Sequence, residues 1–423
     1  MNPKALLEMN VELLRSVLRF DSPADAVVSA FFRQHRTLGS RERHTLAETT
    51  YAVLRRRLLL QNLAQSGTGP LERRLVSLAW AGQDSFLRSA LTPAEIEWLD
   101  SARSMEKEQW NTLPERLRHN LPEWLATPLL EQVGADEFWK LVEAMNRPAN
   151  LDLRVNTLKS RREEVLEAFA QAGLPAQATP WSPWGVRLEG KPALQKMEVF
   201  TSGGVEVQDE GSQLLALLTE AKRGEMVVDF CAGAGGKTLA LGAMMRNTGR
   251  LYAFDVSAHR LEALKPRLAR SGLSNVYPAG ISHERDERVK RLSGKIDRVL
   301  VDAPCSGLGT LRRNPDLKWR QSPQAVQELV VKQTAILASA ARMLKAGGRL
   351  VYATCSLLAD ENERIAEAFS AANPGFEPVP VAEILERQKL GEAAASLAEG
   401  PFLRLWPHRH GTDGFFAAVW QRK

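Results

Sequence analysis

Cysteine is scarce in this sequence, which contains three, Cys231, Cys305 and Cys355, far apart along 423 residues. Their odd number and wide separation argue against a disulfide framework, and the spacing is not that of a zinc site. Long apolar runs are lacking too, since none approaches the ~18–20 residues that a membrane span needs. The first residues do not form the apolar core of a signal peptide. We therefore expect a cytoplasmic protein with no membrane contact and no metal.

The remaining composition is ordinary for a globular protein, with 44% hydrophobic and 25% charged residues. A chain of this length can form two or three domains, each with its own core. The formal net charge of +6 is compatible with a polyanionic partner. Arg41, Arg43 and the run Arg55–Arg57 add basic charge near the N-terminus. We interpret them as a solvated helix face in preference to a phosphate-contacting surface.

The pattern of the sequence changes twice along the chain. Residues 1–132 have helical periodicity and helix start signals. Residues 133–205 read as a small α/β module, with strands at 150–156 and 185–189 around a helix at 161–172. Residues 206–423 alternate strands and helices, with predicted strands at 226–230, 250–255, 298–302, 349–354 and 415–421. This alternation predicts an open, mostly parallel α/β sheet that binds ligands at the carboxyl ends of its strands.

A glycine-rich turn follows the first strand of the last region and opens a helix. Glycines let the backbone approach a ligand, and a helix start offers unpaired N–H groups. A Walker A loop would need glycine at Cys231, and a dinucleotide fingerprint would need a third glycine at Thr238. Neither is present, so the ligand that we predict is S-adenosylmethionine, which has no phosphates. The turn residues predicted to bind it are Cys231, Ala232, Gly233, Ala234, Gly235, Gly236 and Lys237.

The next predicted strand ends in Asp255. A carboxylate at this place can accept both ribose hydroxyl protons of an adenosine. The alternative is that Asp255 only caps the following helix. The spacing after the glycine-rich turn favours the ligand role.

Two of the cysteines lie in short motifs directly after predicted strands, Asp302–Gly307 and Ala353–Ser356. Both motifs therefore belong to the sheet edge that carries the glycine-rich turn. Carbon 5 of cytosine is a poor nucleophile, but addition of a thiolate to carbon 6 enables it to attack a sulfonium methyl group. Such a site needs an activated cysteine, a hydrogen-bond partner at ring N3 and a base for the carbon-5 proton. Cys305, Cys355 and Asp302 can supply these parts, although a buried structural pair of cysteines could mimic them.

With these motifs the sequence resembles the Sun/Fmu family of RNA 5-methylcytosine methyltransferases. The segments that carry the resemblance are Val207–Gln213, Asp229–Thr238, Asp302–Gly307, Arg313–Trp319, Thr354–Ser356 and Asp413–Phe416, with Leu153–Thr157 upstream. Leu38–Arg43 and Tyr51–Arg55 are similar to the NusB-like helical domain of ribosomal small-subunit members. The resemblance implies a NusB-like helical RNA-binding domain at 1–132, an RRM-like α/β module at 133–205 and a Rossmann-like catalytic domain at 206–423.

The resemblance also implies roles for single residues. Cys355 would be the nucleophile, Cys305 would assist release of the methylated base, and Asp302 would lie beside the cofactor and bond the cytosine N3 edge. The turn Cys231–Lys237 would line the methionine part of S-adenosylmethionine, and Asp255 would bind its ribose. The implied substrate is RNA, most simply 16S ribosomal RNA, and we expect a monomer. The family commonly carries an Asp after Gly280, near the adenine amino group. Here that residue is Ile281, so other groups must hold adenine.

The target cytosine must be unstacked, because a duplex hides carbon 6. Arg312, Arg313, Lys318 and Arg320, interleaved with Trp319, could hold an RNA backbone and stack a base. A solvent-facing loop with a core tryptophan is an equal alternative for Trp319.

Two other functions stay open. A DNA cytosine-C5 methyltransferase would use the Pro-Cys cysteine as its nucleophile, but it usually carries a large recognition insertion that this sequence lacks. An RNA-binding ribosome assembly factor with a degenerate methyltransferase domain is favoured by Ile281 and disfavoured by the intact Cys305 and Cys355.

Overall fold

The computed structural model describes residues 2–190 and 192–423, and the chain divides into two compact units. The helical unit comprises the residues up to Pro148 together with Leu311–Pro323. The sheet unit comprises Ala149–Thr310 and Gln324–Lys423. The chain thus leaves the sheet unit after Thr310 and returns to it at Gln324. In the described part of the chain, no helix has the length and apolar character needed to cross a membrane.

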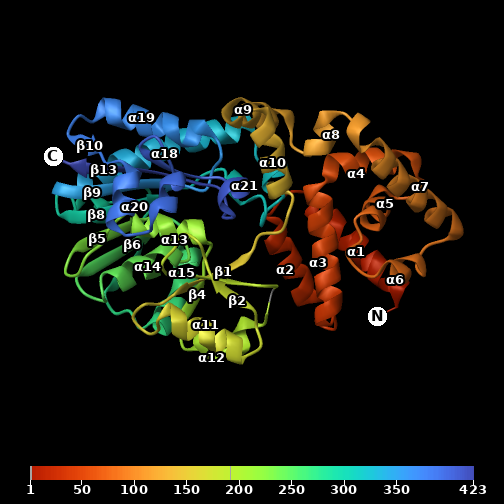
Figure 1. Ribbon diagram of the computed structural model, residues 1–423, viewed down its shortest axis with the longest axis horizontal. Coiled ribbons are helices and arrows are strands. Elements are labelled where there is room, and N and C mark those ends of the chain that lie inside the picture. Colours follow the sequence, from red (N-terminus) through yellow and green to blue (C-terminus); the bar gives the residue numbers. More distant parts are fainter. Residues whose placement is uncertain (1, 191) are drawn as a thin grey trace. The chain divides into compact units, whose positions relative to one another are not determined.

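The helical unit contains the amphipathic helices that the N-terminal sequence predicts. Asn2 caps the first helix, where its side chain accepts the Ala5 N–H at 2.8 Å, and Thr92 and Glu95 form a capping box. Helix α1 lies against α2, α3 and α5 and buries leucines on two faces (Figure 1). The helices of this unit are α1 Pro3–Val17, α2 Ala24–Gln34, α3 Ser40–Arg55, α4 Arg57–Leu63, η1 Ala64–Ser66, α5 Leu71–Leu78, α6 Asp84–Arg88, α7 Pro93–Gln109, η2 Trp110–Thr112, α8 Glu115–His119, α9 Glu123–Val133, α10 Ala135–Met145 and α17 Leu317–Arg320.

The segment Leu311–Pro323 forms hydrogen bonds with other parts of the helical unit. Lys318 is 3% exposed, and its Nζ donates to the Arg55 carbonyl at 2.8 Å. Trp319 donates from Nε1 to the Leu54 carbonyl at 2.8 Å and packs on the core beneath α1 and α3. The prediction that Lys318 holds RNA is therefore wrong. For Trp319 the structure favours the alternative of a tryptophan packed against the core, where it is partly buried.

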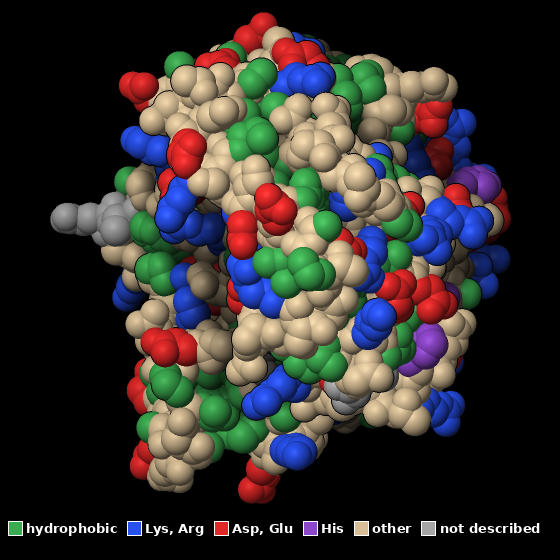
Figure 2. Space-filling model, turned by 90° about the vertical axis from the view of Figure 1, so that its right-hand side faces the viewer, with side chains coloured by type: hydrophobic (Ala, Val, Ile, Leu, Met, Phe, Trp, Pro, Cys, Tyr) green, Lys and Arg blue, Asp and Glu red, His purple; other side chains and the backbone are tan. Residues whose placement is uncertain are grey.

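The arginine run at the end of α3 is also committed to intramolecular contacts. Arg55 is buried and donates to the Arg312 carbonyl at 3.3 Å, Arg56 pairs with Glu106, and the Arg57 guanidinium lies 5.4 Å from the centre of the Trp319 ring. On the face displayed in Figure 2, Lys and Arg side chains are interspersed with Asp and Glu. The run is thus partly buried and engaged within the unit, so it is not the fully solvated face that we predict from the sequence, and phosphate contact by its half-buried members stays a prediction.

The sheet unit begins with a small antiparallel sheet of order β2-β3-β1-β4. Val165 and Phe169 of helix α11 are buried against it, together with Leu153 of β1. The division into domains at residues 132 and 205 stays a prediction. The elements are β1 Leu151–Val155, α11 Arg162–Gln171, β2 Ala176–Ala178, β3 Gly185–Leu188, η3 Leu194–Lys196, α12 Glu198–Thr201 and β4 Val205–Val207.

A second, larger sheet has the order β11-β12-β13-β9-β8-β5-β6-β7, with β10 paired to β13. The five neighbouring strands β9, β8, β5, β6 and β7 are parallel to one another, and β13 is antiparallel to β9. The predicted open, mostly parallel α/β fold is therefore confirmed. Its strands are β5 Met226–Phe230, β6 Arg250–Asp255, β7 Val276–Gly280, β8 Ile296–Asp302, β9 Leu344–Thr354, β10 Phe376–Pro378, β11 Ala398–Glu399, β12 Phe402–Leu405 and β13 Phe415–Arg422.

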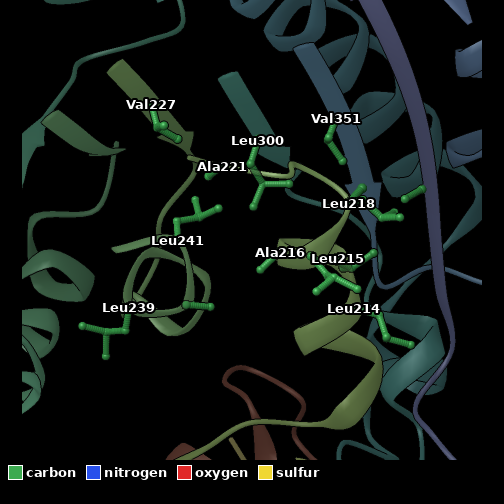
Figure 3. Close-up of a cluster of buried hydrophobic side chains, with 14 of the residues drawn as sticks. Leu214, Leu215, Ala216, Leu218, Ala221, Val227, Leu239, Leu241, Leu300 and Val351 are labelled. Atoms are coloured by element: carbon green, nitrogen blue, oxygen red, sulfur yellow. The ribbon is translucent and has the colours of Figure 1, made fainter. Parts of the chain in front are cut away.

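Helices cover both faces of this sheet because its strands are apolar on both sides. Val227 and Val351 point to the face covered by α13, α14, α15 and α20, where they belong to one buried cluster with leucines of α13 and α14, among them Leu218 and Leu241 (Figure 3). Val228 and Leu350 point to the opposite face, covered by α18 and α19. Each fully buried leucine of this kind contributes about 1.5–3 kcal/mol. The helices are α13 Glu210–Leu217, α14 Gly236–Met244, α15 Ala258–Ser271, α16 Glu287–Lys290, η4 Leu308–Thr310, α18 Pro323–Met343, η5 Ala359–Glu361, α19 Glu363–Ala372, α20 Val381–Arg387, η6 Glu392–Leu397 and α21 Pro407–His410.

Candidate active site

The order of the large sheet places a ligand site between β5 and β8. From β5 the chain continues outward through β6 and β7, then crosses to β8 and β9 on the other side of β5. Such a reversal leaves a crevice at the carboxyl ends of the strands. A cavity of about 900 Å³ lies there, and the predicted site residues that line it are Cys231, Ala232, Gly233, Ala234, Gly236, Lys237, Asp255, Asp302, Cys305 and Cys355. Gly235 is not among the residues that line it.

The glycine-rich turn is shaped by its backbone. Cys231 has a φ of 107°, and its N–H donates to the Phe254 carbonyl at 2.9 Å, which ties the turn to β6. A Cβ on Gly235 would lie 2.1 Å from a Leu264 methyl carbon, so this position needs glycine for packing. A Cβ on Gly233 would meet no atom within 4 Å. The turn therefore presents open space above Gly233, and α14 starts beside it without a side-chain cap.

Asp255 is fixed at the edge of the cavity. Its Oδ2 accepts the Gly233 N–H at 2.8 Å and its Oδ1 accepts the Ser257 N–H at 2.7 Å. Each carboxylate oxygen has two lone pairs, so each keeps one for a further donor. The helix-capping alternative fits poorly, because Ser257 itself caps α15.

Lys237 turns its ammonium toward a carboxylate. Its Nζ donates to Asp302 Oδ2 at 2.7 Å. Burial alone would lower the pKa of Lys237, but the negative charge of Asp302 and the nearby Cys355 raise it above its ordinary value. Lys237 is thus a stable cation engaged with Asp302, unlike the free lysine of a phosphate-binding loop.

The two cysteine motifs meet because β8 and β9 are adjacent and parallel. Asp302 pairs with Ala353 in the register of these strands, so the loops after them run side by side. The Sγ atoms of Cys305 and Cys355 are 3.4 Å apart. The hydrogen bond with Cys355, together with burial, raises the pKa of Cys305 well above its ordinary value. Cys305 therefore keeps its proton over a wider pH range than an ordinary cysteine.

The chain is similar to known proteins. A family model described as 16S rRNA methyltransferase RsmB/F matches residues 216–421, and one for the ferredoxin-like domain of RsmF/B-like methyltransferases matches residues 121–195. The probable ribosomal RNA small subunit methyltransferase B of Synechocystis sp. is 30% identical over 440 residues, which cover 96% of this chain and 97% of that protein. This chain belongs to the RsmB/F methyltransferase family.

Solved structures agree with this membership. The crystal structure of PH0851 is 27% identical, with a TM-score of 0.78, and the match covers 100% of this chain and 99% of that chain. A methyltransferase homolog protein from Pyrococcus horikoshii is 30% identical, with a TM-score of 0.62, over 73% of this chain and 97% of that one. This RsmB/F family member is therefore an S-adenosylmethionine-dependent methyltransferase.

The cavity of the RsmB/F family member fits that cofactor. The fixed carboxylate of Asp255 can accept from two ribose hydroxyl groups, and the space above Gly233 can take the methionine part. Val256, 58% exposed, and Ile281 line the cavity with apolar surface. With no carboxylate at residue 281, the polar side chains that line the cavity just beyond it belong to Ser282, His283 and Glu284.

Several residues at the site were not predicted. Gln208 lies in a motif that carried the family resemblance, but the sequence assigned it no role, and it lines the cavity. Lys332 lines the cavity from α18, and nothing in the sequence marks it. Asp229 lies at the end of β5, where it accepts from Thr238 Oγ1 at 2.6 Å and burial raises its pKa to about 7. Among residues 2–190 and 192–423, no cluster of His, Cys, Asp or Glu side chains could hold a metal ion.

Proposed function

We propose that this protein methylates carbon 5 of a cytosine in 16S ribosomal RNA through a covalent bond between Cys355 and carbon 6. The observation that carries the proposal is the pair of thiols, 3.4 Å apart, in the cavity that also contains Asp302 and Lys237. The relatives named ribosomal RNA small subunit methyltransferase B support the choice of substrate. The methylated position must be unstacked to enter such a cavity.

The attack step is assigned to Cys355. Its thiolate forms a bond to carbon 6, and the electron pair of the C5=C6 double bond moves toward carbon 5. The proton that Lys237 shares with Asp302 can reach the ring N3 edge, where negative charge develops. S-adenosylmethionine, when bound along the glycine-rich turn, supplies the electrophilic methyl group for carbon 5.

The release step is assigned to Cys355 and Cys305 together. A base removes the proton from carbon 5, the electron pair of that C–H bond restores the C5=C6 double bond, and the C6–S bond breaks. The electron pair of that bond returns to Cys355 as a thiolate. Cys305, protonated and 3.4 Å away, can donate a hydrogen bond to the departing sulfur. This makes Cys355 a better leaving group.

Single cysteine variants test the proposal. Cys355→Ala should abolish methyl transfer to ribosomal RNA, whereas Cys305→Ala should accumulate a protein–RNA adduct that survives denaturing electrophoresis. An adduct in Cys355→Ala instead would show that Cys305 is the nucleophile, as in DNA-type enzymes. RNA binding without any transfer of methyl label would favour an assembly factor. Bisulfite sequencing of ribosomal RNA from a deletion strain would identify the nucleotide.

A further inference from the structure

The loops that carry the two cysteines are fastened by two consecutive buried residues. Glu361 ends η5 and Asn362 caps α19, and both side chains are fully buried. Neither residue touches the cavity. They lie behind the thiols, so they can act on the reaction only through the loops that they hold.

Glu361 holds the loop of Cys305. Its Oε1 accepts the Ser306 N–H at 2.8 Å and its Oε2 accepts the Ser306 hydroxyl at 2.5 Å. Gln333 of α18 donates from Nε2 to the Pro304 carbonyl at 2.9 Å and to Glu361 Oε1 at 3.0 Å. Both chain neighbours of Cys305 are thus tied to one Glu361–Gln333 pair.

Asn362 holds the loop of Cys355. Its Oδ1 accepts from the Thr354 hydroxyl, and its Nδ2 donates to the Ser356 carbonyl at 3.0 Å. Both chain neighbours of Cys355 are thus tied to Asn362. Glu361 reaches this loop too, through the Ser356 hydroxyl and, within residues 2–190 and 192–423, not through a backbone group of Thr354 or Ser356.

We propose that Glu361 is the positioning residue of Cys305 and Asn362 that of Cys355, so that neighbouring residues separately govern release and attack. This inference rests on the proposed function, since it takes the roles of the two cysteines from it. Buried hydrogen bonds to backbone groups and to neighbouring hydroxyls fix a loop in one position. A shift of about 1 Å in a catalytic group can lower a rate by about a hundredfold.

The two residues should therefore give opposite phenotypes. In Glu361→Ala, Cys305 drifts from the departing sulfur, so the C6–S bond breaks slowly and adduct accumulates at least tenfold over wild type. In Asn362→Ala, Cys355 is displaced, so little adduct forms even when Cys305→Ala is also present. Glu361→Gln should restore most of the release, because its amide oxygen can still accept the Ser306 N–H and the serine hydroxyls can turn to accept.

The measurement is denaturing electrophoresis of protein incubated with ribosomal RNA and methyl donor. A second readout needs no turnover: the rate at which iodoacetamide alkylates each cysteine, followed by mass spectrometry. Glu361→Ala should change the alkylation rate of Cys305 more than that of Cys355, and Asn362→Ala should do the reverse. The matched control is Asp360→Asn, which removes the neighbouring carboxylate that pairs with Arg364 and should behave as wild type.

A second route covers the case in which Glu361→Ala does not fold. Gln333→Met removes the donor to Pro304, and it also removes a buried Oε1 that has no partner among the described residues, so it should fold. It too should accumulate adduct. No adduct in Cys305→Ala would overturn the proposed function. Adduct in Cys305→Ala but in neither Glu361→Ala nor Gln333→Met would overturn this inference alone.

Discussion

Replacement of Lys318 by methionine should stabilise the helical unit. Lys318 is buried beneath α3, with one hydrogen bond to the Arg55 carbonyl at 2.8 Å. Burial, and then the positive charge of Arg55, lower the pKa of Lys318 from 10.5 to about 7. Methionine has a similar length and no charge, so it can fill the same space without the penalty of burying an ammonium group.

The expected magnitude follows from proton linkage. One pKa unit is equivalent to about 1.4 kcal/mol, so the buried ammonium costs about 4 kcal/mol at pH 7 and about 1 kcal/mol at pH 10. Because the pKa of Lys318 is lower in the folded state, the unfolded chain binds more protons between pH 7 and about 10.5. The stability of the wild type therefore rises with pH across this window and is insensitive to Lys318 below it. The variant loses a hydrogen bond of about 1 kcal/mol. It should thus be more stable by about 3 kcal/mol at pH 7 and by almost nothing at pH 10.

Native-state hydrogen exchange of α3 amides, read by mass spectrometry at several pH values, would measure this difference in the helical unit itself. Lys318→Met should slow exchange at pH 7 more than at pH 10, after correction for the intrinsic rate. Faster exchange in the variant at every pH would refute the reasoning, because Lys318 would then be a net stabilising cation. If Lys318→Met instead lowers the affinity for RNA and leaves the exchange of the α3 amides unchanged, Lys318 contacts RNA, as the sequence predicts.

Two further substitutions test other parts of the sheet unit. Asp255→Ala should weaken S-adenosylmethionine binding at least tenfold in calorimetry, because Gly233 and the ribose lose their acceptor; unchanged affinity would remove Asp255 from the site. Glu220→Gln should remove one source of the loss of folding stability in acid. Burial raises the pKa of Glu220, but hydrogen bonds and ion pairs with Arg387 and Arg349 outweigh burial and hold this pKa at about 2. The wild type should therefore lose about 2–3 kcal/mol more than the variant between pH 5 and 2, as measured by urea unfolding, and an equal loss in the two proteins would contradict this.

The central strands could be predicted because their sequence is both apolar and sharply ended. β5 and β6 end in Phe230 and Asp255, directly before turn residues, and their predicted bounds match the structure. β7 was missed because it is an edge strand that contains Pro278 and an exposed Tyr277. Proline is tolerated there, since an edge strand leaves one row of N–H groups unpaired. Such a strand lacks the pattern from which buried strands are recognised.

The candidate site, too, could be predicted from the sequence only where its residues follow a recognisable strand. Cys305 and Cys355 could be brought together from sequence because each follows an apolar strand, and parallel strands end at one edge. The roles of Glu361 and Gln333 could not be predicted from the sequence. Glu361 contacts Ser306, and Gln333 contacts Pro304, only after α18 and α19 have packed on the sheet. Lys318 was misassigned because lysine is almost never fully buried, so composition alone places it on the surface.

Two backbone hydrogen bonds of Gly309 fix the end of the Cys305 loop before the chain enters the helical unit. The Gly309 N–H donates to the Cys355 carbonyl at 2.8 Å, and the Gly414 N–H donates to the Gly309 carbonyl at 2.8 Å. A Cβ at Gly309 would lie 2.1 Å from the Gly414 carbonyl oxygen, so only glycine permits this approach. With Ser306 held by Glu361 on one side and Gly309 on the other, the loop of Cys305 is held by contacts within the sheet unit. The stability change caused by Lys318→Met should therefore leave adduct formation unaltered, even though Lys318 follows Cys305 closely in the chain.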